Sequence, residues 1–95
     1  MIRSFRGAET ELIWQGVRSR KLPPDIQPVA LRKLMMLYRA KTLNDLRVPP
    51  ANRLESLKGK RAGQWSIRIN RRWRICFRWH EGDATDVEIV EYHDE

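Results

Sequence analysis

The second half of the chain alternates between apolar and polar residues in a way that predicts three antiparallel strands. Trp65–Asn70 and Trp73–His80 alternate strictly around a turn at 70–72, and a last strand is expected at Thr85–Tyr92 after a turn at 81–83. Successive side chains of a strand point to opposite faces of the sheet. One face is therefore expected to form the core with the apolar side chains Trp65, Ile67, Ile69, Trp73, Ile75, Phe77, Trp79, Val87 and Ile89.

The same alternation defines the opposite face of the predicted sheet. It holds Ser66, Arg68, Asn70, Arg74, Cys76, Arg78, Glu88, Val90 and Tyr92. We expect this face to be open, wet and basic, because the phase of the strands gathers Arg68, Arg74 and Arg78 on one surface.

The first half of the chain is predicted to be mainly helical. A short strand is expected at Ile2–Phe5 and a helix at Ala8–Val17, followed by a basic, proline-ended linker over 16–24. A second helix is expected from Asp25 to Ala40, with apolar residues at helical spacing, namely Ile26, Val29, Ala30, Leu34 and Leu37. Two helices packed on a small antiparallel meander make an α+β fold, which we expect to be one domain over residues 1–95.

Composition limits the chemistry that this domain is expected to use. Cys76 is the only cysteine, so no disulfide can form within the chain, and one cysteine with two histidines cannot build the usual four-ligand zinc site. We therefore expect no metal, no cofactor and a reducing compartment. The sequence has no apolar run of the roughly 20 residues that span a bilayer and no apolar signal segment at Met1–Arg6, so we expect a cytoplasmic protein without a membrane partner.

The charge of the chain is unevenly distributed. The net charge of +7 comes from 19 Lys and Arg against 12 Asp and Glu. Residues 53–80 carry nine basic side chains and one acid, Glu55, whereas residues 81–95 carry seven acids and neither Lys nor Arg. Such a basic block is typical of a nucleic-acid binder. The alternative interpretation is a solvated basic surface without a partner.

A few residues near the basic face have the chemistry to cut RNA. Cleavage needs no metal when the 2′-OH attacks its own phosphate, provided that the protein moves protons and stabilises the developing negative charge. The candidates are Glu55, Lys58, Arg68, Arg74, Tyr92 and His93. Structural interpretations stand beside these roles. Glu55 could be a surface acid paired with a neighbouring cation, Lys58 a turn residue, Tyr92 part of the core edge and His93 an inert residue near the chain end, while His80 fits a turn better than a catalyst.

Several ordered motifs resemble one toxin family over essentially the whole chain. They are Asn52-Arg-Leu-Glu-Ser-Leu-Lys-Gly59, Arg61-Ala-Gly-Gln-Trp-Ser-Ile-Arg-Ile-Asn70, Trp73-Arg-Ile-Cys-Phe77 and Val87-Glu-Ile-Val-Glu-Tyr-His93, with Met1-Ile-Arg-Ser-Phe5 as the opening. Together they look like the HigB branch of the RelE/ParE toxins. The resemblance implies the toxin of a type II toxin–antitoxin pair, with a β-α-α-β-β-β arrangement. It also implies cleavage of mRNA in the 30S A site of the translating ribosome and neutralisation by a HigA-like helix-turn-helix antitoxin.

The resemblance also implies roles for individual residues. Lys58, Arg74, Tyr92 and His93 match the active positions of the branch, and we expect Glu55 to complete the catalytic set. The expected RNA-binding residues are Arg61, Arg68, Asn70 and Arg78. Some ribosome-dependent members have His at the position of Glu55 and Asp at that of Glu91, which leaves the acid–base assignment open and favours weak cleavage.

Three functions remain open at this point. The first is a ribonuclease with Glu55 or His93 as base, cations on the phosphate, and His93 or Tyr92 at the leaving group. The second is a non-catalytic poison, as the ParE relatives inhibit DNA gyrase. The third is a basic module that binds RNA without cutting it. The pair Tyr92-His93 favours the nuclease, since a pure binder does not need a titratable pair there.

Overall fold

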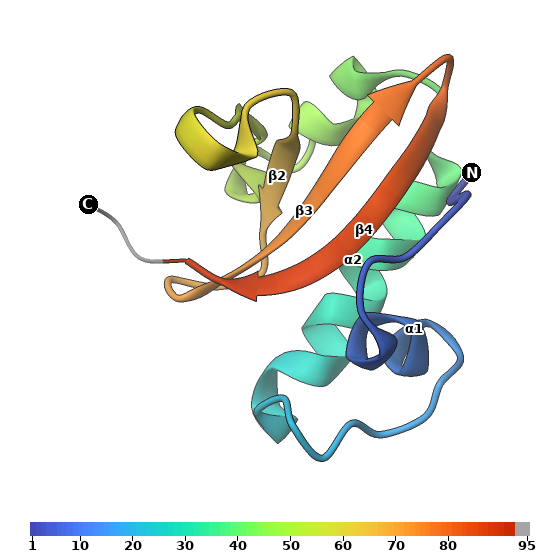
Figure 1. Ribbon diagram of the computed structural model, residues 1–95, viewed down its shortest axis with the longest axis vertical. Helices are drawn as coiled ribbons and strands as arrows, with labels where there is room; N and C mark the ends of the chain where they lie inside the picture. The colour runs from blue at the N-terminus through green and yellow to red at the C-terminus, as the bar shows by residue number, and fades with distance from the viewer. Residues whose placement is uncertain (93–95) are drawn as a thin grey trace.

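The computed structural model describes residues 1–92, which form two helices and a four-stranded antiparallel sheet (Figure 1). The α-helices are α1 (Ala8–Trp14) and α2 (Gln27–Arg39). The sheet has the order β1-β2-β3-β4, with β1 at Glu55–Ser56, β2 at Trp65–Arg68, β3 at Trp73–His80 and β4 at Asp83–Glu91. Short 3-10 helices lie at η1 (Pro24–Ile26), η2 (Leu43–Arg47), η3 (Pro50–Asn52) and η4 (Gly59–Arg61).

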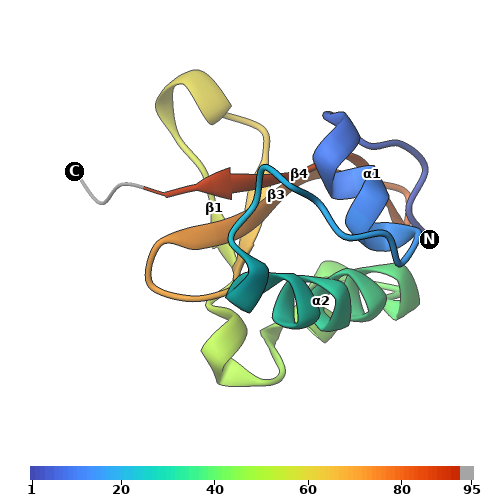
Figure 2. The same ribbon diagram turned by 90° about the horizontal axis from the view of Figure 1, so that it is seen from below.

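The core lies between α2 and one face of the sheet, as the alternation predicts. Leu34 and Leu37 of α2 are fully buried, as are Ile75 and Phe77 of β3 and Val87 of β4. Figure 2 shows α2 on one side of the sheet and the turn around η4 on the other. Three half-buried tryptophans that share the apolar face pack against this core, namely Trp65, Trp73 and Trp79. The predicted fold class and the predicted core face are therefore confirmed.

The first helix is shorter than predicted, and the segment after it is packed rather than a free linker. α1 ends at Trp14, three residues before Val17, and the chain then turns at Gly16 with a positive φ of 79°. Ser19 is buried and exchanges two backbone hydrogen bonds with the Gln27 side chain, which also donates to the Leu22 carbonyl. A buried glutamine thus holds the loop 16–24 against the start of α2.

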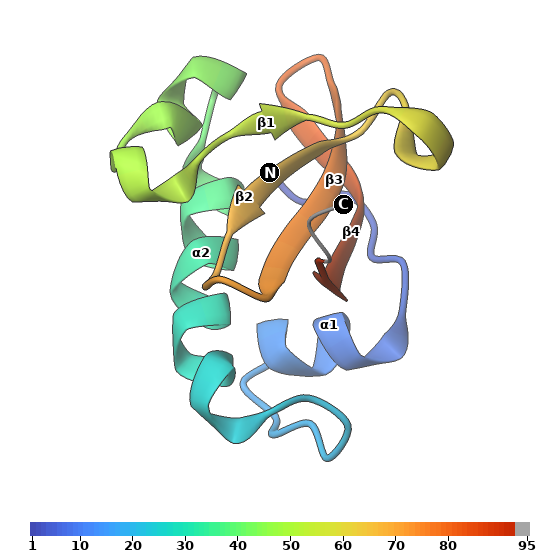
Figure 3. The ribbon, with the colours of Figure 1, turned by 90° about the vertical axis from the view of Figure 1, so that its left-hand side faces the viewer.

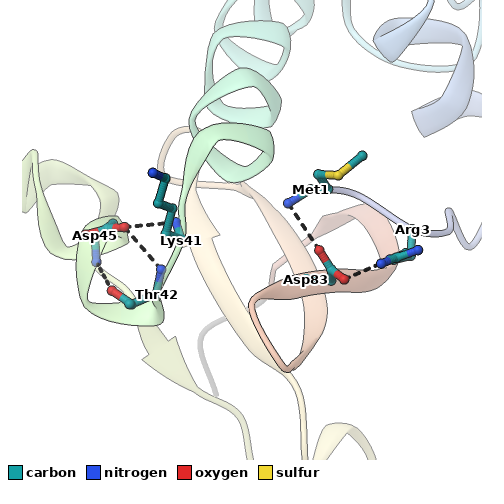
Figure 4. A network of polar contacts seen from close by, with 6 residues as sticks. All are labelled: Met1, Arg3, Lys41, Thr42, Asp45 and Asp83. Atoms are coloured by element: carbon teal, nitrogen blue, oxygen red, sulfur yellow. Dashed lines mark hydrogen bonds and ion pairs between the residues drawn. The ribbon is translucent and has the colours of Figure 1, made fainter.

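The predicted strand at Ile2–Phe5 is not a regular strand. This segment makes only isolated parallel bridges, from Ile2 to Ala84 and from Phe5 to Val87. It is anchored by charge, because Asp83 accepts a hydrogen bond from Arg3 Nε at 2.7 Å and lies 3.4 Å from the amino group of Met1 (Figure 4). The hydrogen bond from Arg3, together with the amino group, holds the pKa of the Asp83 carboxyl below its ordinary value.

β4 begins earlier than predicted and contains a bulge. Its register against β3 shifts between the pairs Cys76–Glu88 and Arg78–Thr85. Asp86 takes up the extra residue with a left-handed φ of 51°. The bulge places Ala84 and Val87, which are an odd number of residues apart, on the same buried face.

The segment between α2 and β1, for which the sequence pattern predicts no element, is stabilised locally. Thr42 and Asp45 form a capping box at the start of η2, visible in Figure 4. Hydrogen bonds from the backbone N–H groups of Lys41 and Thr42 lower the pKa of the Asp45 carboxyl. The segment leads to β1, which lies at the open edge of the sheet beside β2 (Figure 3). Among residues 1–92, no helix is long and apolar enough to cross a membrane.

Candidate active site

The polar face of the sheet is only partly open, because Asn70 and Arg78 are exposed as predicted but the centre of the face is covered. Ser66, Arg74 and Cys76 are only 0%, 5% and 1% exposed. Beside these residues lies the segment 53–61, which sequence alternation does not predict: the Arg53 carbonyl accepts a hydrogen bond from Arg74, and residues 55–61 line a hollow together with Cys76. The last residue of the segment, Arg61, reaches Glu88 of β4 with Nη1 3.2 Å from Oε1. Burial raises the pKa of the covered Cys76 thiol above its ordinary value.

Arg74 lies at the covered centre of this face and is held on two edges. Its Nε donates to the Ser66 hydroxyl at 2.8 Å, and its Nη2 donates to the Arg53 carbonyl at 2.7 Å. Nη1 lies 3.9 Å from Oε1 of Glu55, which is itself exposed. The buried cation is therefore hydrogen-bonded and has a carboxylate nearby, as burial of a charge requires.

Tyr92 follows β4 and lies against Arg74. The guanidinium carbon of Arg74 is 5.2 Å from the centre of the Tyr92 ring, a cation–π contact. The β2–β3 turn holds this end of the chain, because the Tyr92 N–H donates to the Arg72 carbonyl and Arg72 Nη2 contacts Glu91 at 3.0 Å. Figure 1 shows the turn beside the end of β4. His93, the other predicted member of this pair, lies outside the described residues.

Two hollows that share lining residues open on this side of the sheet. The smaller hollow, of about 390 Å³, is lined by Arg53, Glu55, Arg68, Asn70, Arg71, Arg74 and Tyr92. The larger hollow, of about 670 Å³, is lined by the loop 55–61, Cys76, Val90, Glu91 and Tyr92. Glu55 and Tyr92 belong to both, so they stand at the junction.

The smaller hollow has the charge that a phosphate requires. Four of its lining residues are arginines, and Glu55 is its one carboxylate. The guanidinium group presents N–H donors in a rigid planar fork that matches phosphate oxygens. The larger hollow differs, since Leu57, Cys76 and Val90 give it apolar surface beside the exposed cation Lys58. The two hollows can therefore accept different parts of one polyanion.

The structure brings together four of the predicted catalytic residues, Glu55, Lys58, Arg74 and Tyr92, around the two hollows. Among the predicted RNA-binding residues, Arg68 and Asn70 line the smaller hollow and Arg61 lines the larger one. Asn70 also has a structural task, because its Oδ1 accepts from the N–H groups of Arg72 and Trp73 and shapes the turn.

Arg78 is placed differently from the other predicted RNA-binding residues. It is exposed on β3, its Nε lies 3.6 Å from Asp86 Oδ2, and it is not among the residues that line either hollow. The bulge in β4 leads to this pairing, since it brings Asp86 out of the regular alternation.

Three residues of the site were missed by the sequence reasoning. Arg53 and Arg71 line the smaller hollow, and the Ser66 hydroxyl accepts the hydrogen bond from Arg74 Nε. Ser66 had a detectable signal, because it shares the strand phase of Arg68 and is one of the few small polar residues there. Arg53 and Arg71 were visible only as members of the basic block. No group of three or more His, Cys, Asp or Glu within residues 1–92 is arranged to hold a metal ion.

Two solved structures illustrate the fold of this chain. YafQ from E. coli superposes with a TM-score of 0.59 at 12% identity, over 96% of this chain and 93% of that one. YoeB, in the heterotetrameric YoeB–YefM toxin–antitoxin complex of Staphylococcus aureus, superposes with a TM-score of 0.56 at 15% identity, over 99% of both chains. At these identities the likeness concerns the fold, which is that of the RelE-like toxins.

Sequence comparison assigns the family within this class. The chain belongs to the HigB family of RelE-like toxins of type II toxin–antitoxin systems, whose family model matches residues 3–93. Toxin HigB-1 of Vibrio cholerae is 43% identical over 72 residues, which are 76% of each chain. Endoribonuclease HigB of Proteus vulgaris is 33% identical over 94 residues, covering 98% of this chain and all of that one. A toxin of a type II system has an antitoxin as its partner.

Proposed function

We propose that this toxin is an endoribonuclease that cleaves mRNA bound to the translating ribosome. The observation that carries the proposal is the meeting of Glu55, Arg74 and Tyr92 at one hollow that Arg53 and Arg68 also line. A potential base, a held cation and an aromatic phenol thus surround a space with the charge that suits a phosphate. The name of the Proteus vulgaris relative supports the same activity.

In the proposed reaction, the substrate supplies its own nucleophile. Glu55 takes the proton of the 2′-OH, and the 2′ oxygen forms a bond to the adjacent phosphorus while the bond from phosphorus to the 5′ oxygen breaks. Arg74 and Arg68 stabilise the negative charge that develops on the phosphate oxygens. Tyr92 or His93 donates the proton that the leaving 5′ oxygen takes up. The products are a 2′,3′-cyclic phosphate and a 5′-hydroxyl end, and no metal is required.

We propose that the ribosome presents the mRNA to the toxin. Arginines line the smaller hollow, and Lys58 and Lys60 extend the positive charge along the larger hollow. An mRNA held in the ribosomal A site reaches the protein with its backbone already ordered, which removes part of the entropy cost of orienting the 2′-OH. The toxin would then act in the cytoplasm, where translation takes place.

The partner that silences the toxin is proposed to be a HigA-like antitoxin with a helix-turn-helix domain. Family membership gives the antitoxin, and the HigB assignment favours this type. We expect co-expression of the small reading frame next to the toxin gene to restore growth and to yield a stable complex. Growth arrest that no neighbouring reading frame relieves would contradict the pairing.

Mapping mRNA ends after adding the purified toxin to programmed ribosomes tests the activity. We expect new ends within the A-site codon, and no cleavage of the same mRNA without ribosomes. Glu55→Gln should lower the cleavage rate about a hundredfold or more, within the range for general acid–base groups. Glu11→Gln is the matched control, because Glu11 is an exposed acid of α1 outside both hollows.

Each other outcome points to a different function. Equal cleavage of free RNA would remove the ribosome from the proposal. Binding without new ends would indicate a module that only binds RNA. Inhibition of gyrase in a supercoiling assay, with mRNA left intact, would indicate a non-catalytic poison.

A further inference from the structure

We propose that Ser66 is a positioning residue, which together with the Arg53 carbonyl sets the direction in which Arg74 presents its guanidinium to the phosphate. The inference rests on the proposed function. It adds a residue that touches no part of the substrate and acts only through Arg74.

The two hydrogen bonds of Arg74 determine the orientation of its guanidinium plane. A single contact would leave the planar group free to rotate, but bonds from Nε to Ser66 and from Nη2 to the Arg53 carbonyl hold two separate edges. An arginine has five N–H donors. Two are occupied here, and among the described residues the other three, on Nη1 and Nη2, have no hydrogen-bond partner. These three remain for a ligand in the smaller hollow, which Arg74 lines.

The Ser66 hydroxyl and the Arg53 carbonyl are each fixed in position by the surrounding structure. Ser66 is fully buried and lies in a cross-strand row between Glu55 of β1 and Cys76 of β3. Arg53 has a left-handed φ of 45° at the end of η3, and its carbonyl accepts the bond from Arg74. The residue before it, Asn52, is buried and hydrogen-bonded to Lys33 of α2. The position of the carbonyl therefore depends on a buried anchor.

Loss of the Ser66 hydroxyl has a specific expected consequence. Nε would lose its buried acceptor, and an unsatisfied donor is costly, so the guanidinium would turn toward another acceptor within reach. That acceptor is Glu55, whose Oε1 is already 3.9 Å from Nη1. A closer Arg74–Glu55 pair would occupy both the cation that stabilises the phosphate and the proposed base. Cleavage would fall although both catalytic side chains remain present.

Single-turnover cleavage of ribosome-bound mRNA by Ser66→Ala tests the inference. We expect the saturating rate to fall between about tenfold and about a hundredfold, since misplacing a catalytic group by about 1 Å costs up to about a hundredfold. The half-saturating toxin concentration should stay nearly unchanged. Thr10→Val is the matched control, because Thr10 is also buried and its hydroxyl also accepts one hydrogen bond, from the Ile89 N–H. It should lose stability while keeping the cleavage rate of its folded fraction.

A double-mutant cycle separates positioning from general damage to the fold. In an Arg74→Lys background, whose side chain has no Nε–H to be held, adding Ser66→Ala should change the rate little. Arg74→Ala serves as a second background, with circular dichroism confirming that each variant is folded. An undiminished rate for Ser66→Ala, or the same loss in all backgrounds, would overturn the inference.

A spectroscopic readout keeps the inference testable if the unmodified toxin cleaves nothing, an outcome that would reject the proposed function alone. The Nε–H resonance of Arg74 should exchange slowly with water and shift when a dinucleoside phosphate is added. In Ser66→Ala we expect fast exchange and a loss of that shift. An Nε–H that stays protected without the Ser66 hydroxyl would exclude the positioning role.

Discussion

Arg68 on β2 and Arg74 on β3 are direct cross-strand partners, so two like charges lie opposite each other on the polar face of the sheet. Like charges at such positions destabilise a sheet. Both residues also line the smaller hollow. A polyanion bound there would reduce the local repulsion, so we expect this pair to couple a cost in folding to affinity for RNA.

Replacing Arg68 should change both the affinity for RNA and the stability of the fold. Arg68→Ala is expected to weaken RNA binding and to reduce the slope of log affinity against log salt by about 0.7, the value for one phosphate contact on a single strand. The urea midpoint should stay the same or rise, because the repulsion with Arg74 is removed. Filter binding over a salt series and urea denaturation measure the two effects.

Arg78→Ala provides the comparison for Arg68→Ala. Arg78 lies on β3 but pairs with Asp86 outside both hollows. We expect its removal to leave the salt slope close to that of the unmodified toxin. Equal slopes for all three proteins would show that the smaller hollow does not hold a phosphate.

The fold could be predicted from the sequence wherever one simple periodicity determines burial. The strict alternation of Trp73–His80 and the helical spacing of Leu34 and Leu37 gave the right elements and the right core. Prediction failed where tertiary contacts override local pattern. The composition of the loop 16–24 is that of a linker, but the Gln27 side chain holds the loop through a hydrogen bond to Ser19. The two-residue strand Glu55–Ser56 is defined only by its pairing with β2.

The site was predictable in its residue types but less in its geometry. The basic block and the family motifs pointed to Glu55, Lys58, Arg74 and Tyr92, which the structure gathers around two hollows. Alternation alone assigned Arg74 to an open face, because it cannot foresee a covering segment. The burial of Arg74 and its hydrogen bond to Ser66 depend on contacts between residues that are distant in sequence.

Asn52 is expected to be among the most sensitive residues outside the sheet. It is buried, its Nδ2 donates to the carbonyls of Leu46 and Val48 at 3.1 and 3.4 Å, and its Oδ1 accepts from Lys33. Burial lowers the pKa of the Lys33 ammonium, with a further contribution from Arg32. Asn52→Ala should lower the free energy of unfolding by about 1–3 kcal/mol, because buried acceptors and a partly buried cation lose their partner.

Chemical denaturation and cleavage assays together test Asn52→Ala. The adjoining Arg53 carbonyl holds Arg74, so the folded variant should also cleave more slowly. Asn44→Ala, at an exposed asparagine of η2, is the control and should change neither quantity. A variant of Asn52 as stable as the unmodified toxin would refute the anchoring role of this side chain.

The stability of the toxin should decrease in acid partly through Asp83. Arg3 and the terminal amino group lower its folded-state pKa below the unfolded value of about 3.9. The carboxylate therefore contributes stability that is complete above the unfolded pKa and is lost as pH falls through the folded one. Asp83→Asn should be less stable than the unmodified toxin at neutral pH, and the two should converge in strong acid. A difference that stays constant from neutral to acid pH would contradict this linkage, and high salt should shrink it at neutral pH.

Tyr92 and His93 offer the sharpest separation between binding and chemistry. Tyr92→Phe keeps the ring beside Arg74 and should bind RNA normally. Tyr92→Ala removes the ring and should weaken binding, since the stacking of an aromatic ring on a base is worth about 1–3 kcal/mol. His93 lies outside the described residues, and its predicted role rests on the ability of an imidazole to accept and donate protons near neutrality. We expect His93→Ala to lower the single-turnover cleavage rate far more than the affinity.

The two variants together assign the proton that the leaving 5′ oxygen takes up. If Tyr92→Phe loses the cleavage rate and His93→Ala keeps it, the phenol of Tyr92 supplies that proton. If His93→Ala loses the rate and Tyr92→Phe keeps it, His93 supplies the proton. Unchanged rates in both variants would remove this pair from catalysis and leave Glu55 and the arginines as the catalytic set.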